Sequence, residues 1–319
     1  MKTIALVYGG FSKEAEISEK SAFQAKNALM GTNYHVYPIF IAKDKWVYKN
    51  DSGVEFPVDK NDFSITVEGK KIVFDKALNL IHGAPGENGV LGSYFSLIGL
   101  PYTSSGVLTS ALTMNKNWTT RFLKESGILV PSSFVVYRGD QASEYLPKAK
   151  YPCFVKPNNG GSSVGTSKAK NEEELIKALE IAFVHDDEII VEEFIQGREF
   201  TCGVMGFNGE IKALPMTEVM PKHEFFDFAD KYGEDGAKEE TPANLPDELT
   251  KKCQSIAVKA FKILRCRNVS RIDFILKENE FYLIEVNTIP GMSAKSILPQ
   301  QAAAVGISFQ ELLIKIIEN

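Results

Sequence analysis

Three oxygen-bearing side chains lie near the C-terminal end of the chain, with a guanidinium beside them: Asp273, Glu285, Asn287 and Arg271. Three protein oxygens suit Mg²⁺, which takes few protein ligands and completes its octahedral shell with water and phosphate. A buried carboxylate without a partner is costly, so a bound cation is the physical expectation. These residues are therefore candidate metal ligands. The alternative is a surface hairpin whose charges are solvated.

Two short apolar runs position these side chains. Residues 272–276 and 281–286 flank a charged turn at 277–280, a pattern typical of an antiparallel β-hairpin. Successive side chains on a strand alternate between faces, so the arginine and the aspartate share a face of the first strand. The glutamate and the asparagine likewise share a face of the second strand. Pairing of the two strands can bring all four side chains together.

Length and composition predict a globular protein with more than one lobe. A chain of 319 residues allows two or three compact lobes, each with its own core. The net charge of −5 and the absence of a long basic run give no electrostatic footprint for nucleic acid. We therefore expect no nucleic-acid partner.

The cysteines and the apolar segments favour a cytoplasmic location. The N-terminal apolar run, Ile4–Tyr8, stops at Gly9-Gly10, and no other stretch is long enough to span a bilayer. We therefore expect neither a signal peptide nor a membrane partner. Scattered cysteines without CxxC or zinc-like spacing favour reduced thiols. They are Cys153, Cys202, Cys253 and Cys266.

The first lobe, residues 1–103, opens as a βαβ unit. The run Ile4–Tyr8 reads as a strand that ends in a glycine turn, and an amphipathic helix follows. Ligands of such units lie beyond the carboxyl end of the strand, where Glu14 and Glu16 begin the helix. Acidic residues also favour a helix N-terminus for purely structural reasons. Residues 46–74 alternate apolar and polar side chains and predict small hairpins.

A histidine in a glycine-rich loop is a second candidate in the first lobe. His82 directly follows the predicted strand 78–81 and precedes the helix 90–98. That position suits contact with a ligand. A lone histidine is as often a structural hydrogen-bonding residue, so the sequence leaves both interpretations open.

The middle lobe, residues 104–191, contains a glycine- and serine-rich loop at 158–165. The GxxxxGK[ST] string is absent, so this is not a Walker loop. Its backbone N–H groups and hydroxyls can nevertheless close over phosphates. Lys116, near the start of a predicted helix 113–125, and Lys156 could add positive charge. A lysine of this kind, taken alone, is more often a solvated surface charge.

The last lobe, residues 192–319, begins with the acidic pair that ends strand 189–193. Residues 221–246 form the longest polar stretch, which predicts a lid or a disordered insertion. An amphipathic helix at 249–264 leads into the metal-binding hairpin. The run Ser308–Glu311 is a capping box that starts the closing helix.

Taken together, these motifs resemble those of ATP-grasp enzymes, and specifically of the D-alanine–D-alanine ligase family. Each motif is weak alone, but their order and spacing along nearly the whole chain are specific. They are 9–18 (GGFSKEAEIS), His82-Gly83, Gly86-Glu87, 100–103 (LPYT), Lys156-Pro157, 161–165 (GSSVG), 230–232 (DKY), 271–273 (RID) and 285–292 (EVNTIPGM).

The resemblance implies a three-lobed α/β ATP-grasp fold with an N-terminal Rossmann-like, pre-ATP-grasp domain at 1–103. Residues 104–191 and 192–319 would form the central and C-terminal ATP-grasp subdomains. It further implies that ATP phosphorylates one D-alanine, whose acyl phosphate is attacked by the amine of a second. The dipeptide supplies peptidoglycan synthesis, and the family resemblance implies a homodimer.

The resemblance also assigns catalytic roles. Glu14 would hold the ammonium of the first D-alanine. Hydrogen bonds that link Glu14 to Ser162 and Tyr232 would close the site against water. Arg271 and the Gly291 backbone N–H would face the oxyanion. Ser296 would receive the second carboxylate. The implied substrate-binding residues are Glu14, His82, Arg271, Gly291, Ser296 and Ile297.

The resemblance places the nucleotide between the middle and last lobes, with two Mg²⁺ ions that Mn²⁺ can replace. Asp273, Glu285 and Asn287 would hold the metals and neutralise the triphosphate. The implied ATP-binding residues are Lys116, Lys156, Ser163, Glu192, Glu193, Ile195, Glu199 and Lys231.

Four positions depart from the family pattern: Ala15, Asn88, Asn115 and Lys295. They stand where arginine, aspartate, aspartate and histidine, respectively, are common. Tyr232 favours an amine as the second nucleophile, because D-lactate-adding relatives often carry histidine there. The alternatives are another ATP-grasp carboxylate–amine ligase with different amino-acid substrates, and an ATP-binding protein without catalysis.

Overall fold

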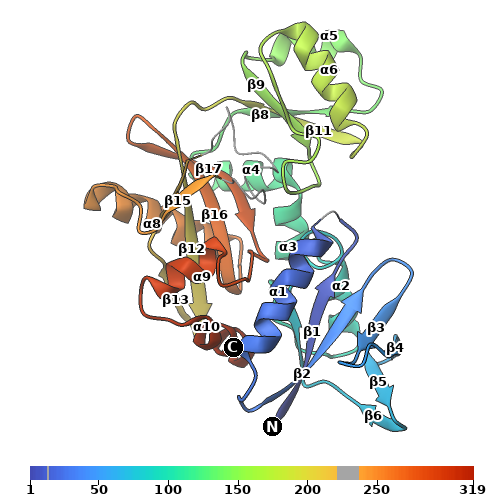
Figure 1. The fold of residues 1–319 in the computed structure, drawn as a ribbon. Helices are drawn as coiled ribbons and strands as arrows, with labels where there is room; N and C mark the ends of the chain where they lie inside the picture. The colour runs from blue at the N-terminus through green and yellow to red at the C-terminus, as the bar shows by residue number, and fades with distance from the viewer. Residues whose placement is uncertain (13, 221–236) are drawn as a thin grey trace.

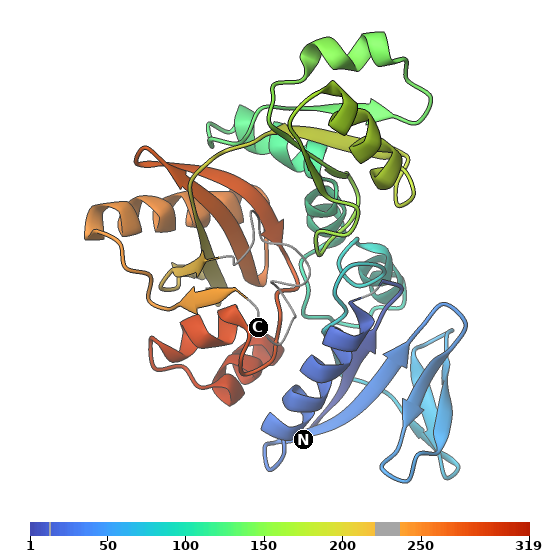
Figure 2. The same ribbon diagram turned by 45° about the horizontal axis from the view of Figure 1, so that its top comes forward.

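The computed structural model of the chain describes residues 1–12, 14–220 and 237–319. Lys13 and residues 221–236, which include Lys231, Tyr232 and most of the predicted lid, lie outside the described residues. Figure 1 and Figure 2 show three sheets, with the first, N-terminal, sheet and its helix α1 (Ala15–Ala28) set beside the C-terminal part of the chain. The predicted α/β class is confirmed.

The first sheet combines a parallel centre with antiparallel hairpins. Its strand order is β6-β5-β4-β3-β2-β1-β7, and β1 pairs in parallel with both β2 and β7. The predicted βαβ opening and the predicted hairpins are both confirmed. The strands are β1 (Lys2–Gly9), β2 (Tyr34–Ile41), β3 (Trp46–Lys49), β4 (Glu55–Asp59), β5 (Ser64–Val67), β6 (Lys70–Ile72) and β7 (Lys76–Asn79).

The helices after the first sheet differ from the sequence prediction at one point. The expected helix 113–125 is two helices, because Asn115 adopts an extended backbone and its side chain accepts a hydrogen bond from the Trp118 N–H at 3.0 Å. Asparagine is a favourable N-cap because its side-chain oxygen satisfies a free N–H group of the first turn. The helices are α2 (Val90–Leu97), α3 (Val107–Met114) and α4 (Lys116–Glu125).

The second sheet is antiparallel with the order β10-β9-β11-β8 and has its own core under α6 (Glu172–Ala182). Asn171 caps α6 by accepting from the Glu174 N–H at 2.9 Å, as its sequence position predicts. The other elements are β8 (Ser133–Tyr137), α5 (Ala142–Tyr145), the 3₁₀ helix η1 (Leu146–Lys148), β9 (Cys153–Pro157), β10 (Ser167–Ala169) and β11 (Glu188–Glu193).

The third sheet carries the hairpin with the candidate metal ligands and follows the order β15-β14-β12-β16-β17, with β13 also paired to β12. Its strands are β12 (Arg198–Phe207), β13 (Glu210–Ala213), β14 (Thr217–Met220), β15 (Lys238–Glu240), β16 (Asn268–Lys277) and β17 (Glu280–Asn287). The helices are α8 (Asp247–Ile263), α9 (Ile297–Ala303) and α10 (Phe309–Glu318). The capping box at Ser308 is present.

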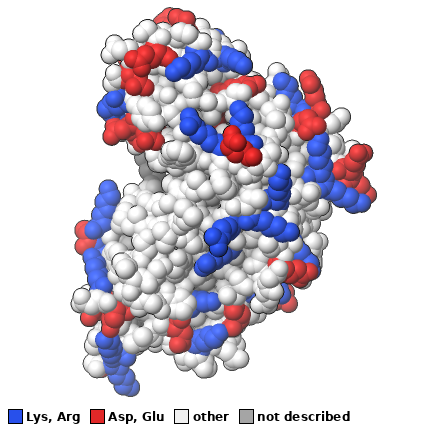
Figure 3. All heavy atoms as spheres, turned by 180° about the vertical axis from the view of Figure 1, so that it is seen from behind, with Lys and Arg blue, Asp and Glu red and all other residues white. Residues whose placement is uncertain are grey.

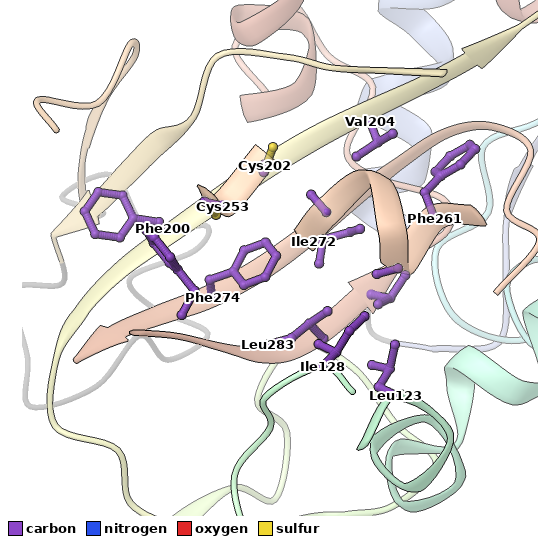
Figure 4. Close-up of a cluster of buried hydrophobic side chains, with 14 of the residues drawn as sticks. Leu123, Ile128, Phe200, Cys202, Val204, Cys253, Phe261, Ile272, Phe274 and Leu283 are labelled. Atoms are coloured by element: carbon purple, nitrogen blue, oxygen red, sulfur yellow. The ribbon is translucent and has the colours of Figure 1, made fainter. Parts of the chain in front are cut away.

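The first and third sheets share a hydrophobic core, whereas the second sheet has its own. One core joins β16, β17 and α8 to side chains of the α4 region, including Leu123 and Ile128 (Figure 4). A second core is shared by β1, α1, the third sheet and α10. The second sheet shares no buried cluster with the other two among the described residues. The first and third sheets are therefore packed as one body, while the second sheet has a separate core.

All four cysteines lie among the described residues as buried free thiols. The described part of the chain has no helix that is long and apolar enough to cross a membrane.

Candidate active site

The hairpin β16–β17 brings the candidate metal ligands together. Asp273 pairs directly with Glu285, and Arg271 pairs with Asn287. The Asn287 amide donates to Asp273 Oδ2 at 3.0 Å. The prediction that these side chains meet on one face is confirmed.

A β-bulge makes this arrangement possible. Phe281 and Leu283 are buried in the core, and strict alternation would place Glu285 and Asn287 on that same core face. The register shifts by one residue between Asp273 and Phe274, which leaves Ile284 as the extra residue. An extra residue in one strand re-aims the side chains beyond it. Glu285 and Asn287 therefore face the site instead of the core.

The two carboxylates have cationic partners in this structure. The Arg271 guanidinium donates two hydrogen bonds to the Asp273 carboxylate, from Nε to Oδ1 at 3.0 Å and from Nη2 to Oδ2 at 2.9 Å. Thr201 Oγ1 donates to Asp273 Oδ1 at 2.7 Å. Lys116 Nζ lies 3.7 Å from Glu285 Oε1. The chain itself thus holds both carboxylates in place.

The glycine- and serine-rich loop contacts the first lobe. Ser162 Oγ donates to the Glu14 carboxylate, and Lys116 Nζ donates to the Gly160 carbonyl. Ser162 has a φ of 52°, in the left-handed region that non-glycine residues rarely adopt. A Cβ on Gly161 would lie 3.3 Å from Glu14 Oε2, so the glycine permits this close approach. The predicted Glu14–Ser162 contact is confirmed, and its third member, Tyr232, lies outside the described residues.

The predicted nucleotide residues include a buried ion pair. Lys156 Nζ lies 2.5 Å from Glu192 Oε2, and their side chains are 13% and 6% exposed. The two residues come from adjacent antiparallel strands, with Lys156 opposite Ile190. Lys156 is therefore not a solvated surface charge, and neither is Lys116, whose side chain is 12% exposed.

The opposite end of the site is built from two loops. His82 is 6% exposed, and its Nδ1 lies 2.8 Å from the Ile289 carbonyl, so this nitrogen carries the proton. Ser296 Oγ lies 2.8 Å from Ser293 Oγ and accepts from the Ser293 N–H at 3.1 Å. A Cβ on Gly291 would come within 2.9 Å of Ser296 Oγ, so only glycine fits there without displacement.

Every predicted site residue that the structure describes lines one cavity of about 660 Å³. The cavity extends from the Lys156–Glu192 pair past the hairpin to Ser296. The predicted residues along its wall are Glu14, His82, Lys116, Lys156, Ser162, Ser163, Glu192, Glu193, Ile195, Glu199, Arg271, Asp273, Glu285, Asn287, Gly291, Ser296 and Ile297.

The sequence interpretation assigned no role to Glu87 and did not identify Thr201. The Glu87 carboxylate accepts from the backbone N–H groups of Gly83, Thr288 and Ile289. Burial raises the pKa of the Glu87 carboxyl, and these N–H donors and nearby His82 oppose that rise. The one available signal was an acid inside an otherwise uncharged glycine loop.

A cavity between two sheets, a glycine- and serine-rich loop over it and an acidic hairpin at its floor define an ATP-grasp enzyme. The family models agree over nearly the whole chain. The model for the D-Ala-D-Ala ligase N-terminus matches residues 3–105, and that for the C-terminus matches residues 122–318. The chain belongs to the D-alanine–D-alanine ligase family.

Full-length relatives carry the same family name. A D-alanine–D-alanine ligase from Flavobacterium johnsoniae is 46% identical, and the match covers 100% of this chain and 99% of the relative. A D-alanine–D-alanine ligase from Christiangramia forsetii is 42% identical, with 99% and 98% covered.

Solved structures share the fold. D-alanyl-alanine synthetase A from Vibrio cholerae has a TM-score of 0.89 at 30% identity and covers 100% of this chain and 98% of its own. The VanG D-Ala:D-Ser ligase from Enterococcus faecalis has a TM-score of 0.89 at 32% identity, with 99% and 98% covered. The Bacillus anthracis D-alanine–D-alanine ligase complexed with ATP has a TM-score of 0.79 at 29% identity, with 100% and 97% covered.

The buried ion pair yields a stability prediction. Replacing Lys156 with methionine leaves Glu192 buried without its cation, and breaking such a pair costs about 3–5 kcal/mol. We expect the double variant Lys156→Met, Glu192→Gln to recover most of that loss, measured by urea unfolding. Lys177→Met, which removes an exposed lysine on α6, is the control. Equal unfolding of the single and double variants would contradict a coupled pair.

Proposed function

We propose that this protein uses ATP to join two D-alanine molecules into D-alanyl-D-alanine for peptidoglycan synthesis. The observation that carries the proposal is the placement of Arg271 beside Asp273 on the hairpin, in one cavity with Glu14 and Ser296. Family membership supports it, as does the activity named for the relatives of 46% and 42% identity.

The reaction proceeds in two steps. A carboxylate oxygen of the first D-alanine attacks the γ-phosphorus of ATP, and ADP leaves. The amine of the second D-alanine then attacks the acyl carbon, loses a proton, and the tetrahedral intermediate expels phosphate. Arg271 and the Gly291 N–H stabilise the negative oxygen of that intermediate, a contribution worth about 10²–10³ in rate for each donor.

Divalent metal is part of the proposal. Asp273, Glu285 and Asn287 provide two carboxylates and an amide oxygen, a donor set that fits Mg²⁺ or Mn²⁺. The Asn287 side chain lies beside Asp273, with its amide nitrogen 3.0 Å from Asp273 Oδ2. Two such ions neutralise the triphosphate when bound.

The substrate ends are held by different lobes. Glu14 binds the ammonium of the first D-alanine, and its contact with Ser162 holds the glycine- and serine-rich loop across the cavity. Ser296, with Ile297 next to it, binds the carboxylate of the second D-alanine. Tyr232 and Lys231 retain their proposed roles in closing the site and contacting phosphate. This closure protects the acyl phosphate from water.

The proposed location is the cytoplasm, where ATP is available and thiols stay reduced. The four buried free cysteines are compatible with that location.

D-alanine should control ATP turnover. Phosphate release from ATP and Mg²⁺ is expected with D-alanine and absent without an amino acid, with one dipeptide formed per phosphate. Substrate pairs containing D-serine, D-lactate or L-alanine serve as controls in the same assay. If ATP turnover does not depend on D-alanine but depends on another amino-acid pair, the protein is a carboxylate–amine ligase with different substrates. ATP binding without any turnover would mean a non-catalytic protein.

Glu285 should control the metal dependence. Glu285→Gln removes one of the two carboxylates, the one that lies 3.7 Å from Lys116 Nζ. We expect turnover at low Mg²⁺ to fall by more than about 100-fold, the upper end of what loss of a group supporting a metal costs. The measurement is phosphate release across a Mg²⁺ titration, with Glu210→Gln on exposed β13 as control. An unchanged Mg²⁺ dependence would contradict the metal assignment.

We also propose that the protein is a homodimer formed through α2 and α3. Residues 88–115 contain no charged side chain, although Leu97 and Leu108 are 86% and 73% exposed. Figure 3 shows a broad area without charged side chains on one face, next to a group of Lys and Arg side chains. A two-fold interface brings a patch against its own copy, and a charge-free patch meets itself without repulsion.

Charge placed on this neutral surface should separate the subunits. Leu97→Glu and Leu108→Glu bring like charges together across the two-fold axis, so each is expected to yield monomers in sedimentation or light scattering. Val184→Glu, at a 79% exposed apolar position on the second lobe, is the matched control. Retention of the dimer in both interface variants would contradict this interface.

A further inference from the structure

Glu87 connects two loops that come from opposite ends of the sequence. It ends the loop 82–87 between β7 and α2, and its carboxylate reaches the segment that follows β17. Oε1 accepts from the Thr288 N–H at 2.8 Å and the Ile289 N–H at 3.0 Å. Oε2 accepts from the Gly83 N–H at 3.1 Å. One carboxylate thus satisfies three backbone donors on two loops.

A second contact joins the same loops in the opposite sense. His82 Nδ1 donates to the Ile289 carbonyl at 2.8 Å, so the 82–87 loop both accepts from and donates to residue 289. Reciprocal hydrogen bonds of this kind fix the distance and the angle between two segments. Those that involve an ionised acceptor are stronger than neutral ones.

The joined segments carry groups of the proposed reaction. Gly291, whose N–H faces the oxyanion, lies two residues after Ile289. On the other loop, His82 Nε2 is buried and makes no hydrogen bond to the described residues. Because Nδ1 is taken up by the Ile289 carbonyl, Nε2 is the ring nitrogen left for a ligand, and the residue lines the cavity. A buried group of this kind requires a partner, which a bound substrate can supply.

We propose that Glu87 is a positioning residue that fixes the Gly291 N–H and His82 Nε2 at the amino-acid end of the cavity. It acts through the two loops and needs no contact with substrate. The expected effect on catalysis rests on the proposed ligase activity. The expected effect on the two loops rests on the hydrogen bonds alone.

Substitution by glutamine should loosen the connection without removing volume. The amide keeps one acceptor oxygen and turns its NH₂ toward backbone N–H groups, so at least one of them loses its acceptor. A misplacement of reacting groups by about 1 Å can cost roughly 10²-fold in rate. Glu87→Asp keeps the charge and shortens the reach, so it should lie between glutamine and the unmodified protein.

The kinetic test compares Glu87→Gln and Glu87→Asp with the unmodified protein. We expect kcat for dipeptide formation to fall by about 10–100-fold in the glutamine variant. The KM for ATP should stay within about two-fold, because Glu87 lies at the amino-acid end. The ratio of ADP to dipeptide formed should exceed one, because a misplaced acyl phosphate is hydrolysed by water more often before the second amine attacks it. Glu19→Gln, an exposed acid on α1, is the control.

A second measurement does not depend on catalysis. Amide hydrogen exchange of a peptide covering residues 288–291 should accelerate by about ten-fold or more in Glu87→Gln, because local opening needs fewer hydrogen bonds broken. Exchange in peptides of the second sheet should remain unchanged.

The outcomes separate the inference from the proposed function. Unchanged exchange at 288–291 in both variants would overturn the positioning role, whatever the activity. A proportional loss of kcat, ATP affinity and thermal stability would indicate a purely structural residue and would also overturn it. If the unmodified protein forms no dipeptide, the ligase proposal fails, and the exchange experiment still decides whether Glu87 holds the two loops.

Discussion

The electrostatic requirement at the β16–β17 hairpin governs the rest of the site. Two carboxylates that face each other across a pair of strands repel unless cations lie nearby. The chain supplies such cations itself, through Arg271 on the same hairpin and Lys116 at the start of α4. These partners keep the acids oriented. A ligand that enters the cavity therefore meets a prepared arrangement, which limits the reorganisation needed during reaction.

The packing explains how the site divides between lobes. The first and third sheets share a hydrophobic core and are further joined by the Glu87 carboxylate, so the amino-acid end is built on one continuous body. The second sheet has its own core and contributes Lys156 and the glycine- and serine-rich loop. The residues at the amino-acid end of the cavity therefore belong to sheets that share a hydrophobic core. The loop of the second sheet reaches the first lobe through a polar contact, Ser162 with Glu14.

This division suits a reaction with a water-sensitive intermediate. An acyl phosphate must be shielded while the second amine approaches, and the shield must open again for product release. Polar contacts across the cavity can form and break at low cost, whereas a shared apolar core cannot. One position that departs from the family pattern has a clear structural place: Asn115 caps α4, whose first residue, Lys116, lies at the hairpin.

The sequence by itself determined the α/β class, the hairpin, the loop at 158–165 and the identity of most candidate residues. These features depend on local alternation, turn residues and motif order, all of which are legible along the chain. The tertiary structure decided the bulge that turns Glu285 away from Phe281, the Lys156–Glu192 pair and the role of Glu87. Each of these depends on contacts between distant segments, where burial and hydrogen-bond satisfaction override local periodicity. A pattern along one strand does not contain the register of its neighbour.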